Sequence, residues 1–590
     1  ILAFVGRTVD SEVSGNMIDL CPVGALTSKP FRYTARNWEL SRRKSVSAHD
    51  SYGSNLMVQS KTDRVMRVLP LRNDAVNEFW LSDRDRFAYE GLNSDERLTR
   101  PMVKRAGVWA EADWNEALEA AAQGLKDIVA RHGSQGLGTL IAPNVTLEEA
   151  HLATQLTRGL GGDNIDYRIR QQDFRARTSG APWLGMKIAD LDQLKAVLLV
   201  GSTIRKEQPL AATRLRQAVK KGLVVNVLHV VADDLLMPVA HSVVTRPSGL
   251  VRELEALAAA LRNESVSEAT QGLARGLRGD GPKAILLGQY ALQHREFAAL
   301  LSIAHEIGRL TGATVGVLPE GANAVGAHLA GAFPSQGLDA QAMFAQPRAG
   351  YLVAGLEAEH DLGRDAADAL GRAEFVVALS AYRDSTTDRA HVILPITPFT
   401  ETAGTFVSLE GRVQSFNAVV KPLGEARPGW KVLRMLGSML GLGGFEAETI
   451  EQVRRAIAPD LQAWAQAGLD NNSEAVAPRA APQPRGLERI AEVGIYAGDP
   501  IVRRAPSLQK TSDAKASARA RFSAPTLASL GLAAGDRVRV RQGGGEAVLV
   551  AAIDAAVPEG CVRVARGLRE TAMLGEGDIS VTKEAVEVAA

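Results

Sequence analysis

The sequence predicts an α/β protein of several domains, and three observations lead to this prediction. The chain has 590 residues, too many for a single hydrophobic core, which indicates roughly three to five domains. Apolar residues make up 46% of the chain and charged residues 23%, as in ordinary globular proteins. Between about residues 110 and 430, apolar runs alternate with helical patterns, as expected for parallel sheets covered by helices.

The strands predicted in this region are short apolar, β-branched runs, each followed by a helical pattern. They are residues 138–142, 196–200, 223–230, 284–287, 314–318, 351–354, 375–379 and 391–394. One helix start is well marked, because Thr146 and Glu149 form a capping-box pattern directly after a strand. That helix is expected to end in the glycine-rich stretch 159–162.

Both ends of the chain have a different texture. Residues 55–59 and 64–69 alternate apolar and polar side chains around a turn at 62–63, which predicts small strands. After Trp430 the chain becomes helical, and the Ala/Pro-rich stretch 475–484 predicts a linker. Near the C-terminus, alternating residues 536–541 and the glycines at 543–545 predict a hairpin that begins a small β domain.

Composition excludes several classes of function. Lys and Arg number 68 and Asp and Glu 67, so no electrostatic case exists for binding nucleic acid or an anionic membrane. The apolar runs are far shorter than the roughly 18 residues that span a bilayer, so we expect no direct membrane insertion. Because the chain starts at Ile1 without an initiator Met or a signal peptide, we expect it to begin inside a longer polypeptide or to be a processed product.

Familiar catalytic motifs are incomplete in the sequence. There is no full Gly-x-Gly-x-x-Gly, no Walker A lysine motif and no Gly-x-Ser-x-Gly elbow. His305 is followed by Arg309 where a zinc-protease helix needs its second histidine. The basic residues 42–44 are expected to form a solvated turn rather than a binding patch.

The two cysteines, Cys21 and Cys561, exclude a disulfide framework and fit a reducing compartment. Cys21 is followed by Pro22, Gly24 and Ala25, the local pattern of the last cysteine ligand of a ferredoxin-type [4Fe-4S] cluster. Proline fixes the chain after the ligand, and the small residues leave room beside a cluster. On these residues alone, a plain buried cysteine is an equally good interpretation. Cys561 lies in a β pattern and is expected to be a core residue.

A longer match adds a resemblance. Residues 15–30 read Gly-Asn-Met-Ile-Asp-Leu-Cys-Pro-Val-Gly-Ala-Leu-Thr-Ser-Lys-Pro, and residues 35–40 read Ala-Arg-Asn-Trp-Glu-Leu. They closely resemble the large iron-sulfur subunit of respiratory complex I, known in bacterial NADH-quinone oxidoreductase as the G subunit. In that family the cysteine equivalent to Cys21 completes a [4Fe-4S] cluster whose other ligands lie upstream. The resemblance therefore implies one metal ligand here, Cys21, with the others upstream of Ile1.

Residues 46–105 resemble the small iron-sulfur domain that opens molybdopterin oxidoreductases. The alignment places Ser47, Asp50, Ser54 and Ser82 where that domain has its four cluster cysteines. Three serines and an aspartate cannot supply four soft thiolates, so the resemblance implies that this second cluster is lost.

If these four residues are remnants of a cluster site, they should lie close together. A cavity left by a cluster cannot stay empty and polar, because each buried unsatisfied group costs about 1–3 kcal/mol. We therefore expect neighbouring side chains, with His49 and Tyr52 at hand, or ordered water to fill the space.

Further stretches extend the resemblance over nearly the whole chain. Residues 201–210 are similar to the complex I subunit, and residues 401–428 contain a segment common to the molybdopterin superfamily. In an active member such loops surround a pterin; here turn glycines, and Arg412 paired with a carboxylate, are the better interpretation. Residues 530–538 resemble the C-terminal β-barrel of the superfamily.

The fold implied is a molybdopterin-oxidoreductase-like multidomain body with parallel sheets, a degenerate iron-sulfur-type β domain before it and a small C-terminal β-barrel domain. The implied division is the end of a ferredoxin-like [4Fe-4S] domain (1–45), the degenerate 4Fe-4S domain (46–105), the α/β domains (106–440), a helical segment and linker (441–520), and the barrel-like domain (521–590).

The function implied is an electron-transfer and scaffold subunit of proton-translocating NADH:quinone oxidoreductase, which passes electrons from NADH and FMN towards quinone. No independent active site, catalytic residue or molybdopterin is expected in this chain. The implied partners are other hydrophilic-arm subunits, including the flavin- and NADH-binding subunit, at the cytoplasmic side of the bacterial inner membrane.

Two alternatives stay open at this point. One is the catalytic subunit of a formate dehydrogenase-like molybdopterin oxidoreductase, against which stand the missing cluster cysteines and the absence of an evident cysteine ligand for the metal. The other is an α/β binding or assembly module with an accidental Cys-Pro pair.

Overall fold

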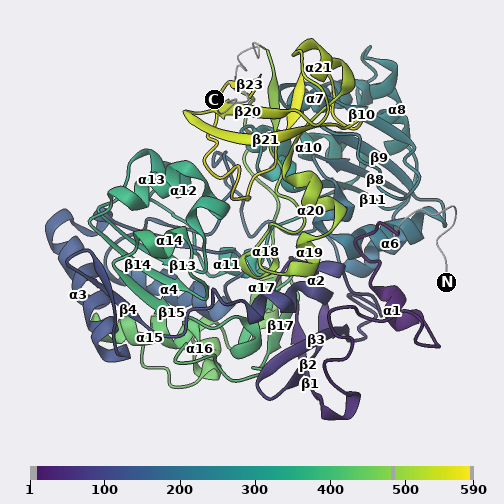
Figure 1. Ribbon diagram of the computed structural model, residues 1–590. Helices are drawn as coiled ribbons and strands as arrows, with labels where there is room; N and C mark the ends of the chain where they lie inside the picture. The colour runs from purple at the N-terminus through teal and green to yellow at the C-terminus, as the bar shows by residue number, and fades with distance from the viewer. Residues whose placement is uncertain (1–8, 480–485, 585–590) are drawn as a thin grey trace, which may run out of the picture. The chain divides into compact units, whose positions relative to one another are not determined.

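The computed structural model describes residues 9–479 and 486–584. They form two compact units that each combine separate segments of the chain (Figure 1). Unit 1 takes the described chain up to Arg170, then Glu320–Leu469 and Gly498–Gln509. Unit 2 takes Gln171–Pro319, Asp470–Ala497 and the described chain from Lys510 onward.

Unit 1 is built on a seven-stranded sheet with an antiparallel pair at one edge and parallel strands in the rest. In spatial order the strands are β5 (Val108–Glu111), β4 (Met102–Arg105), β15 (Val392–Pro395), β14 (Phe375–Ser380), β13 (Gly350–Ala354), β6 (Leu137–Ile141) and β7 (Ile165–Asp166). Every residue of β6, β13 and β15 is buried. Their apolar runs are continuous because both faces of a parallel sheet are covered.

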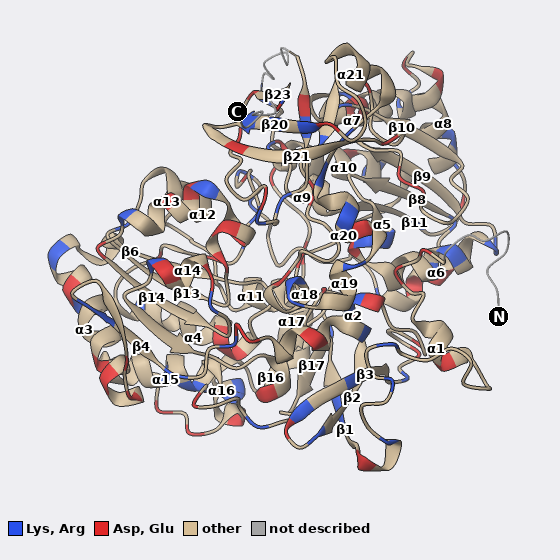
Figure 2. Ribbon diagram, viewed as in Figure 1, with Lys and Arg blue, Asp and Glu red and all other residues tan. Residues whose placement is uncertain are grey.

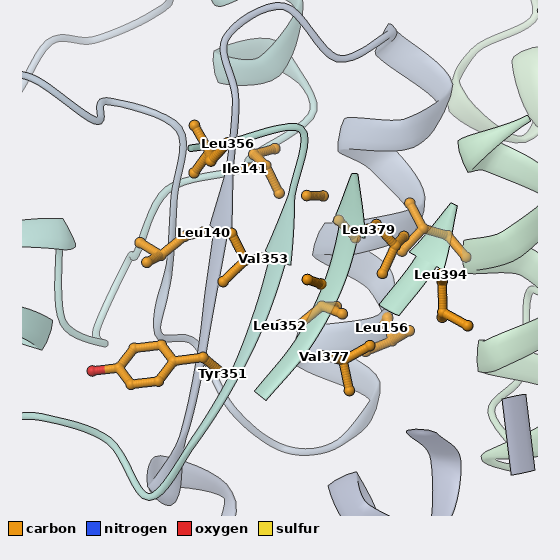
Figure 3. Close-up of a cluster of buried hydrophobic side chains, with 14 of the residues drawn as sticks. Leu140, Ile141, Leu156, Tyr351, Leu352, Val353, Leu356, Val377, Leu379 and Leu394 are labelled. Carbon is orange, nitrogen blue, oxygen red and sulfur yellow. The ribbon is translucent and has the colours of Figure 1, made fainter. Parts of the chain in front are cut away.

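The core of this unit lies between the sheet and its helices. Figure 3 shows Leu140, Val353 and Leu379 from three neighbouring strands together with Leu156 from helix α4 (Leu147–Gly159). Each of these four side chains is at most 1% exposed, and burying one such side chain contributes about 1.5–3 kcal/mol. Helices α3 (Trp114–His132) and α15 (Gly429–Met439) add further side chains to the same core.

The start of α4 confirms the predicted capping box. The hydroxyl of Thr146 accepts a hydrogen bond from Glu149 N–H at 3.2 Å, and Thr146 N–H donates to Glu149 Oε2 at 2.8 Å. Because these bonds satisfy two of the free backbone donors of the first turn, α4 begins directly after β6.

The strand order reverses between β6 and β13. From β6 the sheet continues outward to β7, and from β13 it continues through β14 to β15. In such sheets a crevice opens beyond the carboxyl ends of the two strands at the reversal. The loops that follow these strands, at Ala142 and Gly355, border a pocket.

A three-stranded antiparallel sheet precedes the main sheet in unit 1. Its strands are β1 (Ser41–Val46), β2 (Asn55–Lys61) and β3 (Arg64–Pro70). Thr62 and Asp63 have φ values of 48° and 59°, as a two-residue hairpin turn requires. The prediction of a turn at residues 42–44 is wrong, because these residues lie in β1; they are nevertheless exposed, and such a charged edge strand resists pairing with other strands.

Unit 2 contains a five-stranded parallel sheet. In spatial order its strands are β10 (His241–Val244), β9 (Val224–His229), β8 (Ala196–Val200), β11 (Lys283–Leu287) and β12 (Thr314–Val317). Every residue of β8 is buried. The order reverses between β8 and β11, so this sheet is doubly wound as well.

The C-terminal part of unit 2 is a six-stranded sheet. Its strands are β18 (Glu488–Ile490), β22 (Cys561–Arg563), β19 (Arg519–Phe522), β21 (Gly545–Ile553), β20 (Arg537–Gln542) and β23 (Ile579–Lys583). The antiparallel pair β20–β21 is the predicted hairpin, with Val538 and Val540 buried in the core. The predicted α/β fold with a small β domain at the C-terminus is therefore confirmed.

Charges are interspersed among the elements of each unit (Figure 2), as the net charge of +1 leads one to expect. Within the part of the chain that the structure describes, no helix is both long and apolar enough to cross a membrane. The predicted linker lies partly outside the described residues, at 480–484.

Candidate metal centre

Cys21 lies on a partly exposed turn directly after the short helix α1 (Asn16–Leu20). Its N–H donates to the carbonyl of Met17 at 3.1 Å, and its Sγ accepts from Leu26 N–H at 3.5 Å. The backbone N–H groups of Leu26 and Val23 lower the pKa of the Cys21 thiol. The Cys21 sulfur therefore lies on a partly exposed turn and forms a thiolate more readily than an ordinary cysteine.

Helix α1 is held by the segment that opens helix α2 (Asp83–Phe87). The carboxylate of Asp83 accepts from Gly15 N–H and from the Ser14 hydroxyl, both at 2.6 Å. A Cβ on Gly15 would lie 2.7 Å from both Asp83 Oδ1 and Arg86 Cδ, so this approach requires glycine. Arg86 donates to Asp19 at 2.5 Å. These contacts position the turn that carries Cys21.

The residues aligned with the lost cluster meet on the other side of α2. Ser47, Ser54 and Ser82 are each at most 1% exposed. Ser47 N–H donates to the carbonyl of Ser54 at 2.9 Å. The hydroxyls of Ser47 and Ser82 both donate to the carboxylate of Asp85, the latter at 2.8 Å. Ser82 is therefore close to Ser47 and Ser54 despite its separation in the sequence.

The fourth aligned residue joins the same group. Asp50, 4% exposed, accepts from Arg84 Nη2 at 2.5 Å. Burial and the neighbouring Asp50 carboxylate raise the pKa of Asp85. We call Ser47, Asp50, Ser54, Ser82, Arg84 and Asp85 the buried polar site. The prediction that the four aligned residues lie close together is confirmed.

Neighbouring side chains fill this site, as the sequence led us to expect, but they are those of Arg84 and Asp85. His49 and Tyr52 contribute their backbone N–H groups, which donate to Ser47 Oγ at 3.2 Å and to Asp50 Oδ1 at 3.0 Å. His49 Nδ1 lies 3.0 Å from Asp499 Oδ2, and the Tyr52 hydroxyl donates to a backbone carbonyl at 3.1 Å. The sequence did not single out Arg84 and Asp85, because it does not show which neighbouring side chains turn inward.

Four consecutive charged residues, 83–86, were not recognised as part of a site from the sequence. All are at most 7% exposed, although an alternating Asp-Arg-Asp-Arg run usually reads as a solvated surface. One local signal was present: Ser82 and Asp85 have the spacing of a helix N-cap, and Ser82 Oγ accepts from Asp85 N–H at 3.0 Å.

The superfamily segment at residues 401–428 carries buried ion pairs. Arg97 donates to both oxygens of Glu401, each at 2.8 Å, with both side chains buried. Arg412 donates to Glu410 at 2.5 Å, so the predicted pairing with a carboxylate is confirmed. These charges are satisfied within unit 1 and fix its loops.

In the segment 201–210 of unit 2, a carboxylate accepts hydrogen bonds from the backbone N–H groups at the strand reversal. Glu207 accepts from the N–H groups of Thr203 and Gln289, both at 3.1 Å, and from the Ser202 hydroxyl at 2.9 Å. Burial raises the pKa of Glu207 to about 7. The backbone donors that could hold an anion at this position therefore bind a side chain of the protein itself.

The pocket at the strand reversal of unit 1 has a volume of about 710 Å³ including space open to solvent. Its described lining residues include two carboxylates, Glu149 and Asp499, but no Lys or Arg. The phosphates of a molybdopterin dinucleotide need positive charge or free backbone donors. The lining of this pocket does not fit such a group.

The fold and these loops define the class of protein. The family model for molybdopterin oxidoreductases matches residues 97–439, more than half of the 590 residues. The chain therefore belongs to the molybdopterin oxidoreductase family. Two further family models match its N-terminal part: "NADH-quinone oxidoreductase subunit 3, ferredoxin-like domain" at residues 1–27, and "NADH-ubiquinone oxidoreductase NDSU1/NuoG-like, 4Fe-4S domain" at residues 40–90.

Within this class the chain is similar to particular subunits. It is 30% identical to the NADH-quinone oxidoreductase G subunit of Rickettsia felis over 472 residues, which is 79% of this chain and 65% of the relative. For the G subunit of Rickettsia bellii the identity is 30% over 481 residues, with 80% and 66% covered. The chain spans about two thirds of the length of these relatives. The resemblance to the G subunit predicted from the sequence is confirmed.

A solved structure supports the fold. Acetylene hydratase from Pelobacter acetylenicus has a TM-score of 0.67 at 14% identity, covering 90% of this chain and 96% of that chain. At this level of identity the likeness concerns the architecture, and it agrees with the molybdopterin-oxidoreductase-like fold predicted from the sequence.

Proposed function

We propose that this chain is the part of an NADH-quinone oxidoreductase G subunit that runs from the last ligand of a [4Fe-4S] cluster through the α/β scaffold. The observation that carries the proposal is the position of Cys21 on an accessible turn, with its sulfur accepting from Leu26 N–H. The ferredoxin-like family match at residues 1–27 includes this turn. The similarity to the Rickettsia relatives supports the same function.

When bound, a [4Fe-4S] cluster supplies one-electron transfer. Cys21 would be one of its thiolate ligands, and the N–H groups of Leu26 and Val23 stabilise the negative charge on the sulfur. Asp83 and Arg86 keep α1 and its turn in place. No side chain of this chain is assigned a role as acid, base or nucleophile.

In this role the subunit lies between NADH oxidation and quinone reduction. Electrons enter from a flavin- and NADH-binding subunit and leave towards quinone through other hydrophilic-arm subunits. The place of the chain is then peripheral, on the cytoplasmic side of a bacterial inner membrane. The two α/β units act as a scaffold that packs against the partner subunits.

The test is Cys21→Ala in the full-length protein within its assembled complex. We expect the EPR signal of one [4Fe-4S] cluster to disappear, with the other clusters largely intact, and NADH-to-quinone electron transfer to slow. Cys561→Ala is the matched control, because it removes the other thiol from the core of unit 2. A full set of cluster signals with normal turnover in Cys21→Ala would overturn the proposal.

The alternative is a catalytic molybdopterin subunit. It requires a pterin dinucleotide, which mass spectrometry of the purified full-length protein detects directly. A stoichiometric pterin would favour the alternative. The pocket lining of unit 1 and the similarity to the Rickettsia relatives favour the electron-transfer function.

A further inference from the structure

The strand reversals of the two parallel sheets, one in each unit, differ in one respect. In unit 2 the side chain of Glu207 takes the backbone donors at the reversal. In unit 1 the loops after β6 and β13 border a pocket, which Ala142 and Gly355 help to line. The pocket has a volume of about 710 Å³, open solvent included, and it lies at a strand reversal, where open α/β sheets bind their ligands.

The walls of this pocket are largely apolar. Phe399 follows β15, and Phe406 lies on the two-stranded ribbon of β16 (Gly404–Val407) and β17 (Val413–Phe416). Val145 and Ile396 add aliphatic surface. Aromatic side chains from two different elements give a surface against which a flat ring can pack.

One polar group in the wall has no partner. Thr397 lines the pocket, and its side chain is 5% exposed. Among the described residues no group forms a hydrogen bond with its hydroxyl. The hydroxyl oxygen itself has almost no accessible surface, so a ligand atom reaches it only after the Thr397 side chain rotates. Because buried hydroxyls are nearly always paired, such a rotation would give this group the partner that it lacks.

The charged groups in the wall argue against an anionic ligand. Burial opposes ionisation of Asp499, but pairing with His49 lowers the pKa of this carboxyl, so it is ionised at neutral pH. Burial raises the pKa of Glu149 to about 7, so this carboxyl is about half protonated there. No Lys or Arg occurs among the described lining residues. An anionic ligand would therefore lie beside these two carboxyl groups with no Lys or Arg of the described lining to bind it.

We propose that this pocket binds a small, uncharged, aromatic ring compound that carries a hydrogen-bonding group. The ring packs against Phe399 and Phe406, and the polar group bonds to the hydroxyl of Thr397. This site is separate from the electron-transfer function proposed for Cys21, so either proposal can fail without the other.

The experiment measures binding of 2-naphthol to the full chain at pH 7 by ligand-observed NMR and titration. From its size we expect a dissociation constant on the order of 0.1–1 mM. The matched probe is 2-naphthyl phosphate, which has the same ring and a negative group. We expect 2-naphthyl phosphate to bind at least about tenfold more weakly, because its phosphate would lie beside the carboxyl groups of Asp499 and Glu149.

Variants assign the binding to this pocket. Thr397→Val removes the unpaired hydroxyl with little change in volume and should weaken 2-naphthol about three- to tenfold. Thr400→Val is the matched control, since its hydroxyl is also buried without a partner among the described residues but does not line the pocket. It should leave the dissociation constant within about twofold. Ala142→Leu narrows the pocket and should abolish binding.

Any of three results would overturn the proposal. The first is that 2-naphthol does not bind up to its solubility limit, the second that 2-naphthyl phosphate binds equally well, and the third that Thr397→Val binds 2-naphthol unchanged. If Ala142→Leu does not fold, Thr397→Val and Thr400→Val still decide, because each exchanges only a hydroxyl for a methyl group. Stronger thermal stability of both threonine variants with unchanged binding would mean that the unpaired hydroxyls are structural.

Discussion

Replacing Asp85 by alanine is the sharpest perturbation of the buried polar site. The carboxylate accepts hydrogen bonds from Ser47 and Ser82, whose side chains are 0% and 1% exposed. Asp85→Ala leaves both hydroxyls buried without this acceptor. Each buried unsatisfied group costs about 1–3 kcal/mol, so two of them lower the local free energy of unfolding by about 2–6 kcal/mol.

Hydrogen exchange measures this loss where it arises, because a chain of two units need not unfold in one transition. The amides of β1 to β3 and α2 should exchange between about 30-fold and 20,000-fold faster in Asp85→Ala, at about 1.4 kcal/mol per factor of ten. The amides of β13 in the main sheet serve as the internal control. Asp85→Asn keeps one side-chain oxygen and should change exchange much less.

A double-mutant cycle tests the mechanism. In the parent chain Ser47→Ala removes a satisfied hydroxyl, whereas in Asp85→Ala it removes one that has lost its acceptor. The second substitution should therefore cost less in the Asp85→Ala background. Additive effects, or exchange near α2 that stays within about threefold of the parent in Asp85→Ala, would refute the reasoning.

Two other predictions concern thiols and pH. A thiol reagent at neutral pH should label Cys21 and leave Cys561 unmodified, as peptide mapping would show. Cys21 is partly exposed, whereas burial raises the pKa of Cys561 to about 12. Equal labelling of both cysteines in the folded chain would contradict this prediction. Burial and Glu357 raise the pKa of Asp384 to about 8, so unfolding releases its proton between about pH 4 and 8, and stability falls as the pH rises through this window. Asp384→Asn keeps the oxygen that caps α14 (Ser385–Arg389) but cannot ionise. It should therefore raise the thermal midpoint more at pH 8 than at pH 5, and equal gains at the two pH values would count against a raised pKa of Asp384.

The elements of the α/β units could be predicted because their signals are local. The run at 196–200 is apolar throughout, and it forms β8 with the same bounds. Thr146 and Glu149 carry the cap of α4 within four residues of each other. Such patterns need no knowledge of distant partners, since burial on both faces and a capping box are each written in one short stretch.

The contents of the candidate site were only partly predictable. The local Cys-Pro pattern and a long resemblance predict Cys21 as a ligand, and this stays a prediction, whereas the predicted closeness of Ser47 and Ser82 is confirmed. The burial of Asp83 and Arg84 was missed, because their partners lie at Gly15 and Asp50, far away in the sequence. Side chains that are charged and alternate in sign carry no local sign of being buried.

Helix α2 connects the buried polar site to the turn of Cys21, the residue that we propose as a cluster ligand. Asp83 and Arg86 hold α1 and the turn of Cys21, whereas Asp85 binds the serines of the buried polar site. Because all of these side chains lie on one short helix, the buried polar site also has a structural task. If the polar filling were replaced by empty space, α2 would lose its anchors on one side, and the position of Cys21 would loosen on the other. The hydrogen bonds of the buried polar site are therefore expected to be constrained by the turn of Cys21, and not only by packing within their own domain.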